Sequence, residues 1–279
     1  MKKISRRSFL AASGLTIAAL ALTACGGSAS TASSAASSVA ASSEAASTSA
    51  AAAERTTVEA GKLTMATNAA FPPYEMTTDA GEFEGIDVDT AKAIAEKLGL
   101  ELQIDDMDFD AALLSVQQGK ADIVMAGVTV TDERKAVMDF SDSYATGIQS
   151  IIVPEGSDIA SPDDLAGKKI GTQRGTTGYI YCSDDFGDSN VVAYDNGLTA
   201  VQALNNGQVD AVVIDNAPAQ EFVAANPGLK VLDTSYAEED YAIGMAKGSS
   251  LEDAVNKALE ELKADGTLQS IVDKYINAN

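Results

Sequence analysis

The segment Ala126-Gly127-Val128-Thr129-Val130-Thr131-Asp132-Glu133-Arg134 carries the groups that a protein needs to hold a carboxylate. The run Asp122-Ile123-Val124-Met125 before it predicts a buried strand. Thr131, with two acidic residues behind it, predicts a helix N-cap, and a helix N-terminus presents free N–H groups and a favourable dipole. Arg134 offers a planar guanidinium for two parallel hydrogen bonds. On composition alone, a surface arginine beside an ordinary helix cap explains the segment as well.

Two other places in the chain have polar groups of interest. Gly175-Thr176-Thr177-Gly178 predicts a turn that opens a helix. It lacks the Gly-Lys-Ser/Thr of a phosphate loop, so nucleotide binding is not expected. Asp215 ends an apolar strand, where taken alone it is more simply a capping or surface aspartate.

Composition excludes several functions. The chain has 279 residues, with 41 acidic against 19 basic side chains and a net charge of −22. Such a charge repels nucleic acid and anionic lipid surfaces. Histidine is absent, and Cys25 and Cys182 are the two cysteines, so a four-ligand Cys/His zinc site is impossible. We also expect no cofactor. With Cys25 modified as below, Cys182 has no disulfide partner and is expected to be a packed free thiol.

The N-terminus predicts an export signal. Residues 1–7 are basic, Ser8 to Thr23 are small and apolar, and Leu22-Thr23-Ala24-Cys25 matches a lipobox. Cleavage after residue 24 would leave Cys25 for lipid attachment, and the paired arginines fit either general secretion or twin-arginine export. Residues 25–57 are rich in Ser and Ala and predict a flexible tether.

The remainder alternates strand and helix patterns, which predicts a mainly parallel sheet with ligand chemistry at the C-terminal ends of the strands. Expected strands are 62–67, 101–104, 122–125, 150–153, 169–172, 190–194 and 210–215. Expected helices are 85–97, 109–118, one opened by residues 175–178, 198–206, 251–264 and 267–276.

An internal repeat predicts two lobes. Ala111 to Ala126 and Thr199 to Ile214 each combine a helix, a Gly-containing turn ending in Asp, and an apolar strand. The C-terminal helices should return to the first lobe, which gives two crossovers, near 144–151 and 237–243. The expected first lobe is 58–146 with 242–279, and the second is 147–241.

An ordered set of motifs resembles a known family. They are Phe71-Pro72-Pro73-Tyr74-Glu75, Glu84-Gly85-Ile86-Asp87-Val88-Asp89, Met107-Asp108-Phe109, the Arg134 segment, Val137-Met138-Asp139-Phe140-Ser141, Gly175-Thr176-Thr177-Gly178, Val209 to Asp215 and Ala264-Asp265-Gly266-Thr267. Together they resemble the bacterial extracellular solute-binding proteins of family 3, the polar amino-acid receptors of ABC importers. The resemblance covers residues 58–276 and implies a two-lobed periplasmic-binding-protein-like (type II) α/β fold with two hinge crossovers.

The resemblance also implies a ligand site. Arg134 would clamp the α-carboxylate of an amino acid with Thr129, and the N–H groups of Thr177 and Gly178 would meet the same carboxylate from the second lobe. Asp215 would pair with the α-ammonium group, helped by the Gly127 carbonyl and the Thr129 hydroxyl.

For the ligand side chain, the resemblance implies a sandwich between Phe71 and Phe109, although isolated phenylalanines are more often core. Asn68 stands where several relatives have an acid, which predicts a ligand that is polar and not strongly cationic. Ile214 replaces a histidine of some glutamine receptors, which argues against glutamine. Arg174 either selects acidic side chains or is a solvated loop charge.

These features predict an extracytoplasmic, lipid-anchored monomer that captures an L-amino acid and delivers it to ABC permease subunits. The long tether favours the cell surface of a Gram-positive bacterium over a periplasm. The alternatives are a ligand sensor and an enzyme resembling cyclohexadienyl dehydratase. Without histidine, such an enzyme would depend on a carboxylate such as Glu75, and the sequence shows no partner for it, so an enzyme is not expected.

Overall fold

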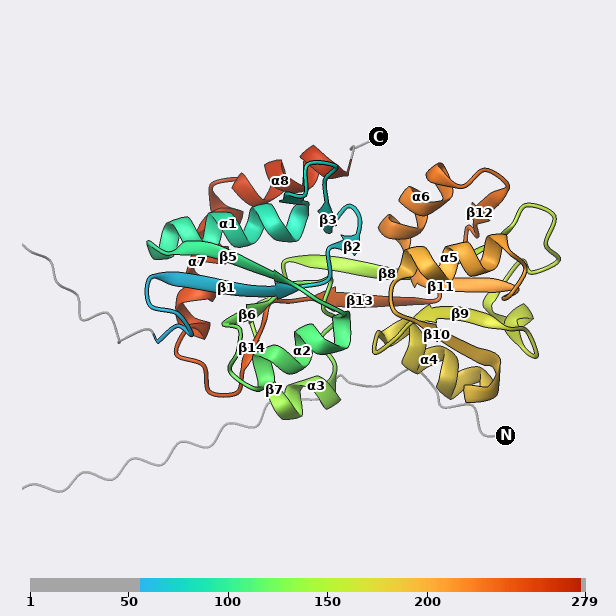
Figure 1. Cartoon of the computed structure of the whole chain (residues 1–279), viewed down its shortest axis with the longest axis horizontal. Coiled ribbons are helices and arrows are strands. Elements are labelled where there is room, and N and C mark those ends of the chain that lie inside the picture. Colours follow the sequence, from blue (N-terminus) through green and yellow to red (C-terminus); the bar gives the residue numbers. More distant parts are fainter. Residues whose placement is uncertain (1–55, 277–279) are drawn as a thin grey trace, which may run out of the picture. The chain divides into compact units, whose positions relative to one another are not determined.

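The computed structural model describes residues 56–276, and the predicted signal, Cys25 and most of the predicted tether lie outside them. The first of two large sheets has the strand order β5 (Glu101–Asp106), β1 (Lys62–Thr67), β6 (Ile123–Val124), β14 (Gly244–Ala246) and β7 (Met138–Phe140). We call this sheet with its helices the first lobe. In Figure 1, α1 (Ile86–Leu98) and α8 (Thr267–Tyr275) lie on one side of it, and α2 (Phe109–Gln117) and α3 (Asp132–Val137) on the other. The remaining helix, α7 (Glu252–Ala264), packs against α1 and α8.

The second large sheet belongs to the second lobe. Its order is β10 (Val191–Tyr194), β9 (Ile170–Gln173), β11 (Ala211–Asp215), β8 (Ala145–Pro154) and β12 (Leu229–Val231), with β13 (Ala237–Tyr241) also paired to β8. Helices α4 (Thr177–Phe186), α5 (Gly197–Asn205) and α6 (Asn216–Ala225) and two short 3-10 helices, η1 (Pro162–Leu165) and η2 (Asp188–Asn190), complete it.

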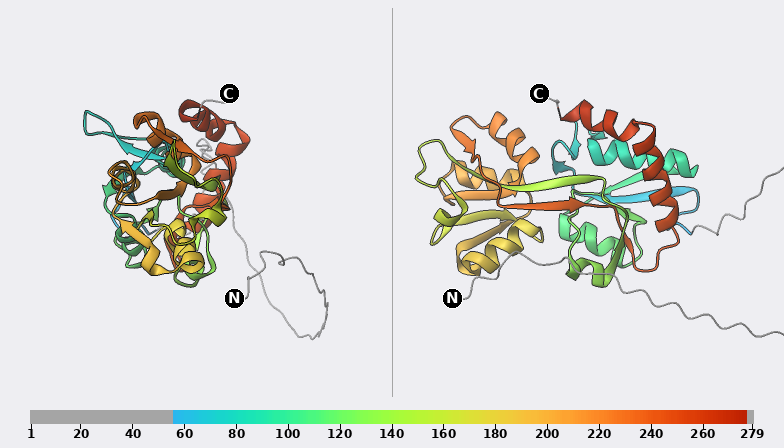
Figure 2. Two further views of the ribbon diagram at one scale, coloured as in Figure 1. Left: turned by 90° about the vertical axis from the view of Figure 1, so that its right-hand side faces the viewer. Right: turned by 180° about the vertical axis from the view of Figure 1, so that it is seen from behind.

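Two strands join the lobes. β8 carries the chain from the first sheet to the second, and β13 carries it back to β14, with Ala237 opposite Gln149 and Tyr241 opposite Ala145. Figure 2 shows these antiparallel strands running between the two groups of elements. The predicted two crossovers are therefore confirmed.

The expectation of mainly parallel sheets was too simple. β1 runs parallel to β5 and β6, but β14 is antiparallel to both of its neighbours, β6 and β7. In the second sheet β8 is antiparallel to every strand that it pairs with. The physical reason is the crossing itself, because strands that leave and re-enter a lobe run against the βαβ direction.

Several short elements were not expected from the sequence. These are β7, β12, η1, η2, α6 and a three-stranded sheet of β2 (Ala70–Phe71), β3 (Glu75–Thr77) and β4 (Phe83–Glu84). Helix α6 begins directly after β11 and holds Pro218 in its first turn, a position that tolerates proline. None of the helices in residues 56–276 combines the length and apolar composition that crossing a membrane requires.

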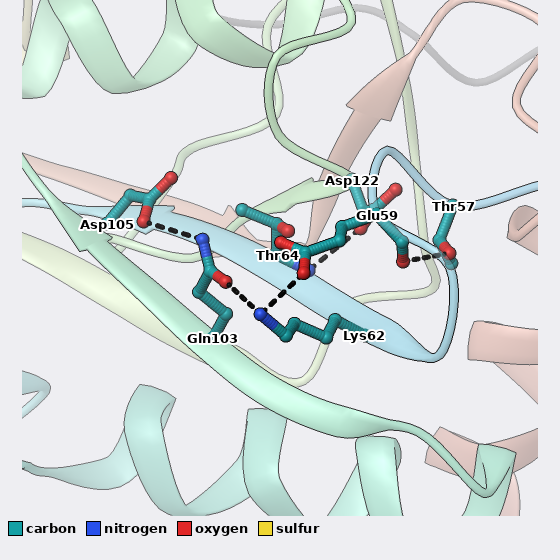
Figure 3. Close-up of polar contacts among 7 residues, drawn as sticks. All are labelled: Thr57, Glu59, Lys62, Thr64, Gln103, Asp105 and Asp122. Carbon is teal, nitrogen blue, oxygen red and sulfur yellow. Dashed lines mark hydrogen bonds and ion pairs between the residues drawn. The ribbon is translucent and has the colours of Figure 1, made fainter.

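The start of β1 is held by a buried acid. The Asp122 carboxylate accepts hydrogen bonds from the backbone N–H groups of Val58 (2.8 Å) and Thr64 (2.7 Å). Figure 3 shows Asp122 beside Thr64, with Lys62 reaching Glu59 at 2.6 Å and Gln103 at 3.1 Å. The acid thereby ties the chain that enters the first lobe to the sheet.

Candidate functional site

A cavity lies between the two lobes, at the C-terminal ends of the parallel strands. Asn68 follows β1, Gly127 and Thr129 follow β6, Gln173 ends β9 and Asp215 ends β11. The complete lining is Asn68, Phe71, Glu75, Phe109, Ala126, Gly127, Thr129, Arg134, Gln173, Thr176, Thr177 and Asp215. Strand polarity explains the location, because the loops after parallel strands meet at one edge of each sheet.

Arg134 is buried and lines this cavity. The predicted cap is present, since the Thr131 side chain accepts the backbone N–H of Arg134 at 3.2 Å. The guanidinium donates to the carbonyls of Thr129 (2.7 Å) and Gly175 (3.2 Å) and lies 5.4 Å from the ring centre of Phe109. Burial lowers the pKa of Arg134, and the nearby Glu239 carboxylate opposes that shift. A guanidinium has five N–H groups, so the two bonds found among the described residues leave donors for an anion.

Two threonines and one acid join the lobes beside Arg134. The Thr129 and Thr177 hydroxyls both donate to Glu239 Oε2, at 3.1 and 2.9 Å. Gln149 Nε2 donates to the same oxygen at 3.0 Å. Glu239 lies on β13, so a single carboxylate on a connecting strand contacts residues of both lobes.

Asp215 provides a buried carboxyl group in the second lobe. It is 8% exposed, and its carboxylate accepts from Gln149 Nε2 at 2.8 Å and from the Tyr241 hydroxyl. Burial, followed by the charge of Glu239, raises the pKa of Asp215 to about 8. A cation placed beside Asp215 would restore its ionised form.

Two aromatic side chains also line the cavity. Phe71 and Phe109 are 6% and 4% exposed. Gly127 has φ of +55°, and an added Cβ there would lie 2.9 Å from Phe71. The Asn68 amide donates to the Met107 carbonyl and accepts from Gln173 Nε2 at 2.9 Å, so it is a contact between the lobes.

Glu75 lines the cavity and lies next to Asp87. Both side chains are fully buried. Asp87 accepts the Gly127 N–H at 3.0 Å and the Tyr144 hydroxyl at 2.7 Å, and its carboxyl lies in hydrogen-bonding range of Glu75. Burial raises the pKa of Asp87 to about 6 and the pKa of Glu75 well above its usual value. Glu75 has no partner that the sequence reveals, but in the structure Asp87 is its partner.

Comparison with known proteins decides the family. The profile of "Bacterial extracellular solute-binding proteins, family 3" matches residues 63–278. The chain belongs to this family. Its members are extracellular solute-binding proteins, so the protein acts outside the cytoplasm.

Three similar proteins illustrate the family. A probable histidine-binding protein of Neisseria gonorrhoeae is 33% identical over 273 residues, or 95% of this chain and 94% of that protein. An ancestral arginine-binding protein bound to glutamine is 44% identical, with a TM-score of 0.74 over 77% of this chain and 98% of that one. A structure of an ancestral arginine-binding protein bound to arginine has the same identity and TM-score over 78% and 99%.

These relatives contradict in part the expectation of a ligand that is not strongly cationic. That expectation depended on the neutral Asn68, which the structure pairs with Gln173, whereas a carboxyl group of the cavity comes from Glu75. The argument against glutamine depended on Ile214. Its side chain packs towards Gly197 and Phe222 in the core and does not line the cavity, so it carries no such information.

Two other predicted site residues lie outside the cavity lining of this family-3 protein. Arg174 has a side chain that is 52% exposed and reaches Asp195 at 3.4 Å, so the interpretation as a solvated loop charge is the one that its position fits. Gly178 follows Thr177 in α4, and a Cβ there would lie 2.9 Å from Gln149 Oε1. The absence of a side chain at Gly178 allows α4 to approach Gln149.

Cys182 is buried, and burial raises its thiol pKa to about 12, as expected of a packed thiol.

Three residues of the cavity lining were not expected there from the sequence: Ala126, Gln173 and Thr176. Glu75 was expected only as a possible catalytic acid. The same signal that selected Asp215, a polar residue at the end of an apolar strand, would have selected Gln173. Glu239 could not be found in this way, because it lies on a strand of mostly polar residues and not at the end of an apolar one. In the part of the chain that the structure describes, no cluster of three or more Cys, Asp and Glu side chains could hold a metal ion.

Proposed function

We propose that this protein is the substrate-binding component of an ABC importer, which binds an L-amino acid between its lobes and delivers it to the membrane permease. One observation carries the proposal. A buried guanidinium, Arg134, and a buried carboxylate, Asp215, face the same cavity from different lobes. An α-amino acid has one carboxylate and one ammonium group and so matches this pair of charges.

The head group of the ligand is held from both lobes. Arg134 binds the carboxylate, and the backbone N–H groups of Thr129 and of Thr177, at the N-terminus of α4, complete that end. Asp215 binds the ammonium group. Because burial raises the pKa of Asp215, a cation beside it is needed to stabilise the ionised carboxylate. Because each lobe holds part of the ligand, binding favours the closed arrangement of the lobes, which a hinge at β8 and β13 permits.

The ligand side chain lies between Phe71 and Phe109 and reaches Glu75. A buried carboxyl without another donor suits an amide or a guanidinium group. The structures of ancestral arginine-binding relatives with arginine and with glutamine support both side-chain classes.

Calorimetry with a panel of L-amino acids tests the proposal. Arg134→Ala should raise the dissociation constant for every ligand by about 100-fold or more, because the ligand carboxylate loses a buried partner. Arg174→Ala is the matched control, and it should change the dissociation constant less than about threefold. If no amino acid binds, or if Arg134→Ala binds as tightly as the parent, the proposal fails.

Turnover of prephenate or arogenate would instead favour an enzyme, for which the Glu75–Asp87 pair supplies an acid.

The lipid anchor is a separate part of the proposal. Cys25 carries the lipid and holds the protein on the outer face of the plasma membrane, supported by the lipobox and the polar residues that follow it. Cys25→Ala should release the protein from the membrane fraction; a variant that stays there has another anchor.

A further inference from the structure

Glu75 is a buried acid with no basic side chain beside it in the described part of the chain. It is fully buried and lines the cavity, and no N–H or O–H of the described residues donates to either of its oxygens. Among residues 56–276, the carboxyl of Asp87 is the group in hydrogen-bonding range of Glu75. Two carboxyl groups can form a hydrogen bond only if one of them holds a proton.

The surroundings of this pair are acidic. Asp106 at the end of β5 and Asp215 at the end of β11 are the other charged groups that act on Glu75. The Tyr144 hydroxyl donates to Asp87, and Tyr74 adjoins both acids. No cation faces Glu75 in the described part of the chain, and Arg134 is bound to the Thr129 and Gly175 carbonyls. A fully ionised pair would therefore bury two negative charges without compensation.

We infer that the Glu75–Asp87 pair links the charge of the bound side chain to one proton, so that the site accepts a neutral side chain with the proton retained and a cationic one with the proton released. The inference rests on the proposed function. It adds a means by which one cavity holds two ligand classes, and it makes the choice between them depend on pH.

The two bound states differ by one proton. With glutamine, the proton stays between Glu75 and Asp87, and a Glu75 oxygen accepts an amide N–H of the ligand. With arginine, Glu75 gives its proton to the solvent, and the resulting carboxylate accepts two N–H groups of the guanidinium. No bond other than the O–H bond breaks.

Linkage turns this difference into a dependence on pH. While the ligand-free pair holds its proton, each rise of one pH unit should strengthen arginine binding about tenfold relative to glutamine binding. A proton released by Asp215 on meeting the ammonium group is common to both ligands, and therefore cancels in the ratio.

Calorimetry at pH 7 in two buffers of different ionisation enthalpy counts the protons directly. Arginine should release about one proton more than glutamine, and the ratio of their dissociation constants should change about tenfold between pH 6.5 and 7.5. Equal proton release by both ligands overturns the inference, as does glutamine binding without arginine binding. If neither these nor any other amino acid binds, the proposed function itself has failed.

Two variants separate proton linkage from structural effects. Glu75→Gln keeps the shape of the neutral acid but has no proton to release. It should therefore weaken arginine binding more than tenfold relative to glutamine binding and abolish the difference in proton release. Asp87→Asn removes the neighbouring charge that holds the proton on Glu75. It should reduce that difference at pH 7 to less than about half while both ligands still bind. If Glu75→Gln binds neither ligand, Asp87→Asn decides, and an unchanged proton count in it overturns the inference.

Discussion

Removal of the Glu239 carboxylate should loosen the closed arrangement of the lobes. Glu239 Oε2 accepts hydrogen bonds from Thr129 in the first lobe and from Thr177 and Gln149 in the second, at 2.9–3.1 Å. The residue touches no part of the proposed ligand position directly. Its effect on binding is therefore a test of how the lobes hold each other.

The size of the effect follows from what remains after Glu239→Ala. A hydrogen bond to a charged group contributes about 1.5–3 kcal/mol. The Thr129 and Thr177 hydroxyl oxygens are 3.4 Å apart and can bond to each other, and Gln149 keeps its 2.8 Å contact with Asp215. The net loss is then about one charge-assisted bond, which raises the dissociation constant by about 10- to 150-fold.

The charge of Glu239 adds little to this figure for a zwitterionic head group. Removing a negative charge favours the ligand carboxylate and disfavours the ligand ammonium group, and the two changes oppose each other. The remaining effect should appear in the dissociation rate, because a weakened closed state opens more often.

Calorimetry gives the dissociation constant, and release of a labelled amino acid into excess unlabelled ligand gives the rate. Glu238→Ala is the matched control, because Glu238 is exposed on the same strand. A Glu239→Ala protein that binds within threefold of the parent, or a Glu238→Ala protein that is equally impaired, refutes the reasoning.

Two further predictions concern stability. Burial raises the pKa of Asp87 to about 6 and of Asp215 to about 8, above the values of an unfolded chain, so the stability that they contribute is fully present below about pH 4 and is lost as the pH rises towards 8. Urea unfolding of the ligand-free protein at pH 5 and 7.5 should show this loss, and Asp215→Asn should reduce it by up to about 1.4 kcal/mol per pH unit; an equal loss in both proteins contradicts the assignment. Asp122→Ala should lower the free energy of unfolding by about 2–3 kcal/mol because two backbone N–H groups lose a charged acceptor. Lys62→Ala, beside it but partly exposed, should lower it by less than about 1 kcal/mol, and equal effects of the two substitutions would count against the anchoring role of Asp122.

Local chemistry made much of the fold readable from the sequence. Thr131 and Thr176 are N-caps in the structure, each accepting a backbone N–H three residues on. The apolar runs at 62–67 and 210–215 correspond to β1 and β11, with Asp215 at the strand end where the pattern places it. These features depend on neighbours in the chain, which a sequence shows directly.

The errors have a common cause. The antiparallel strands β14 and β12 and the connecting strand β13 take their partners from more than 70 residues away in the chain, so no local pattern reports their direction. Arg174 and Ile214 adjoin true cavity residues in sequence, but a strand sends successive side chains to opposite faces and a loop side chain can turn to solvent. A residue next to a cavity residue in the sequence therefore need not line the cavity itself.

By itself, the sequence determined the family, the two-lobed repeat, and the two charges, Arg134 and Asp215, that match an α-amino acid. Tertiary structure alone decided what surrounds them. It placed Glu75 against Asp87, Asn68 against Gln173, and Glu239 between Thr129 and Thr177. Such pairings arise where the lobes and layers pack, and burial there, through desolvation and the distance between charges, sets which of these groups holds a proton.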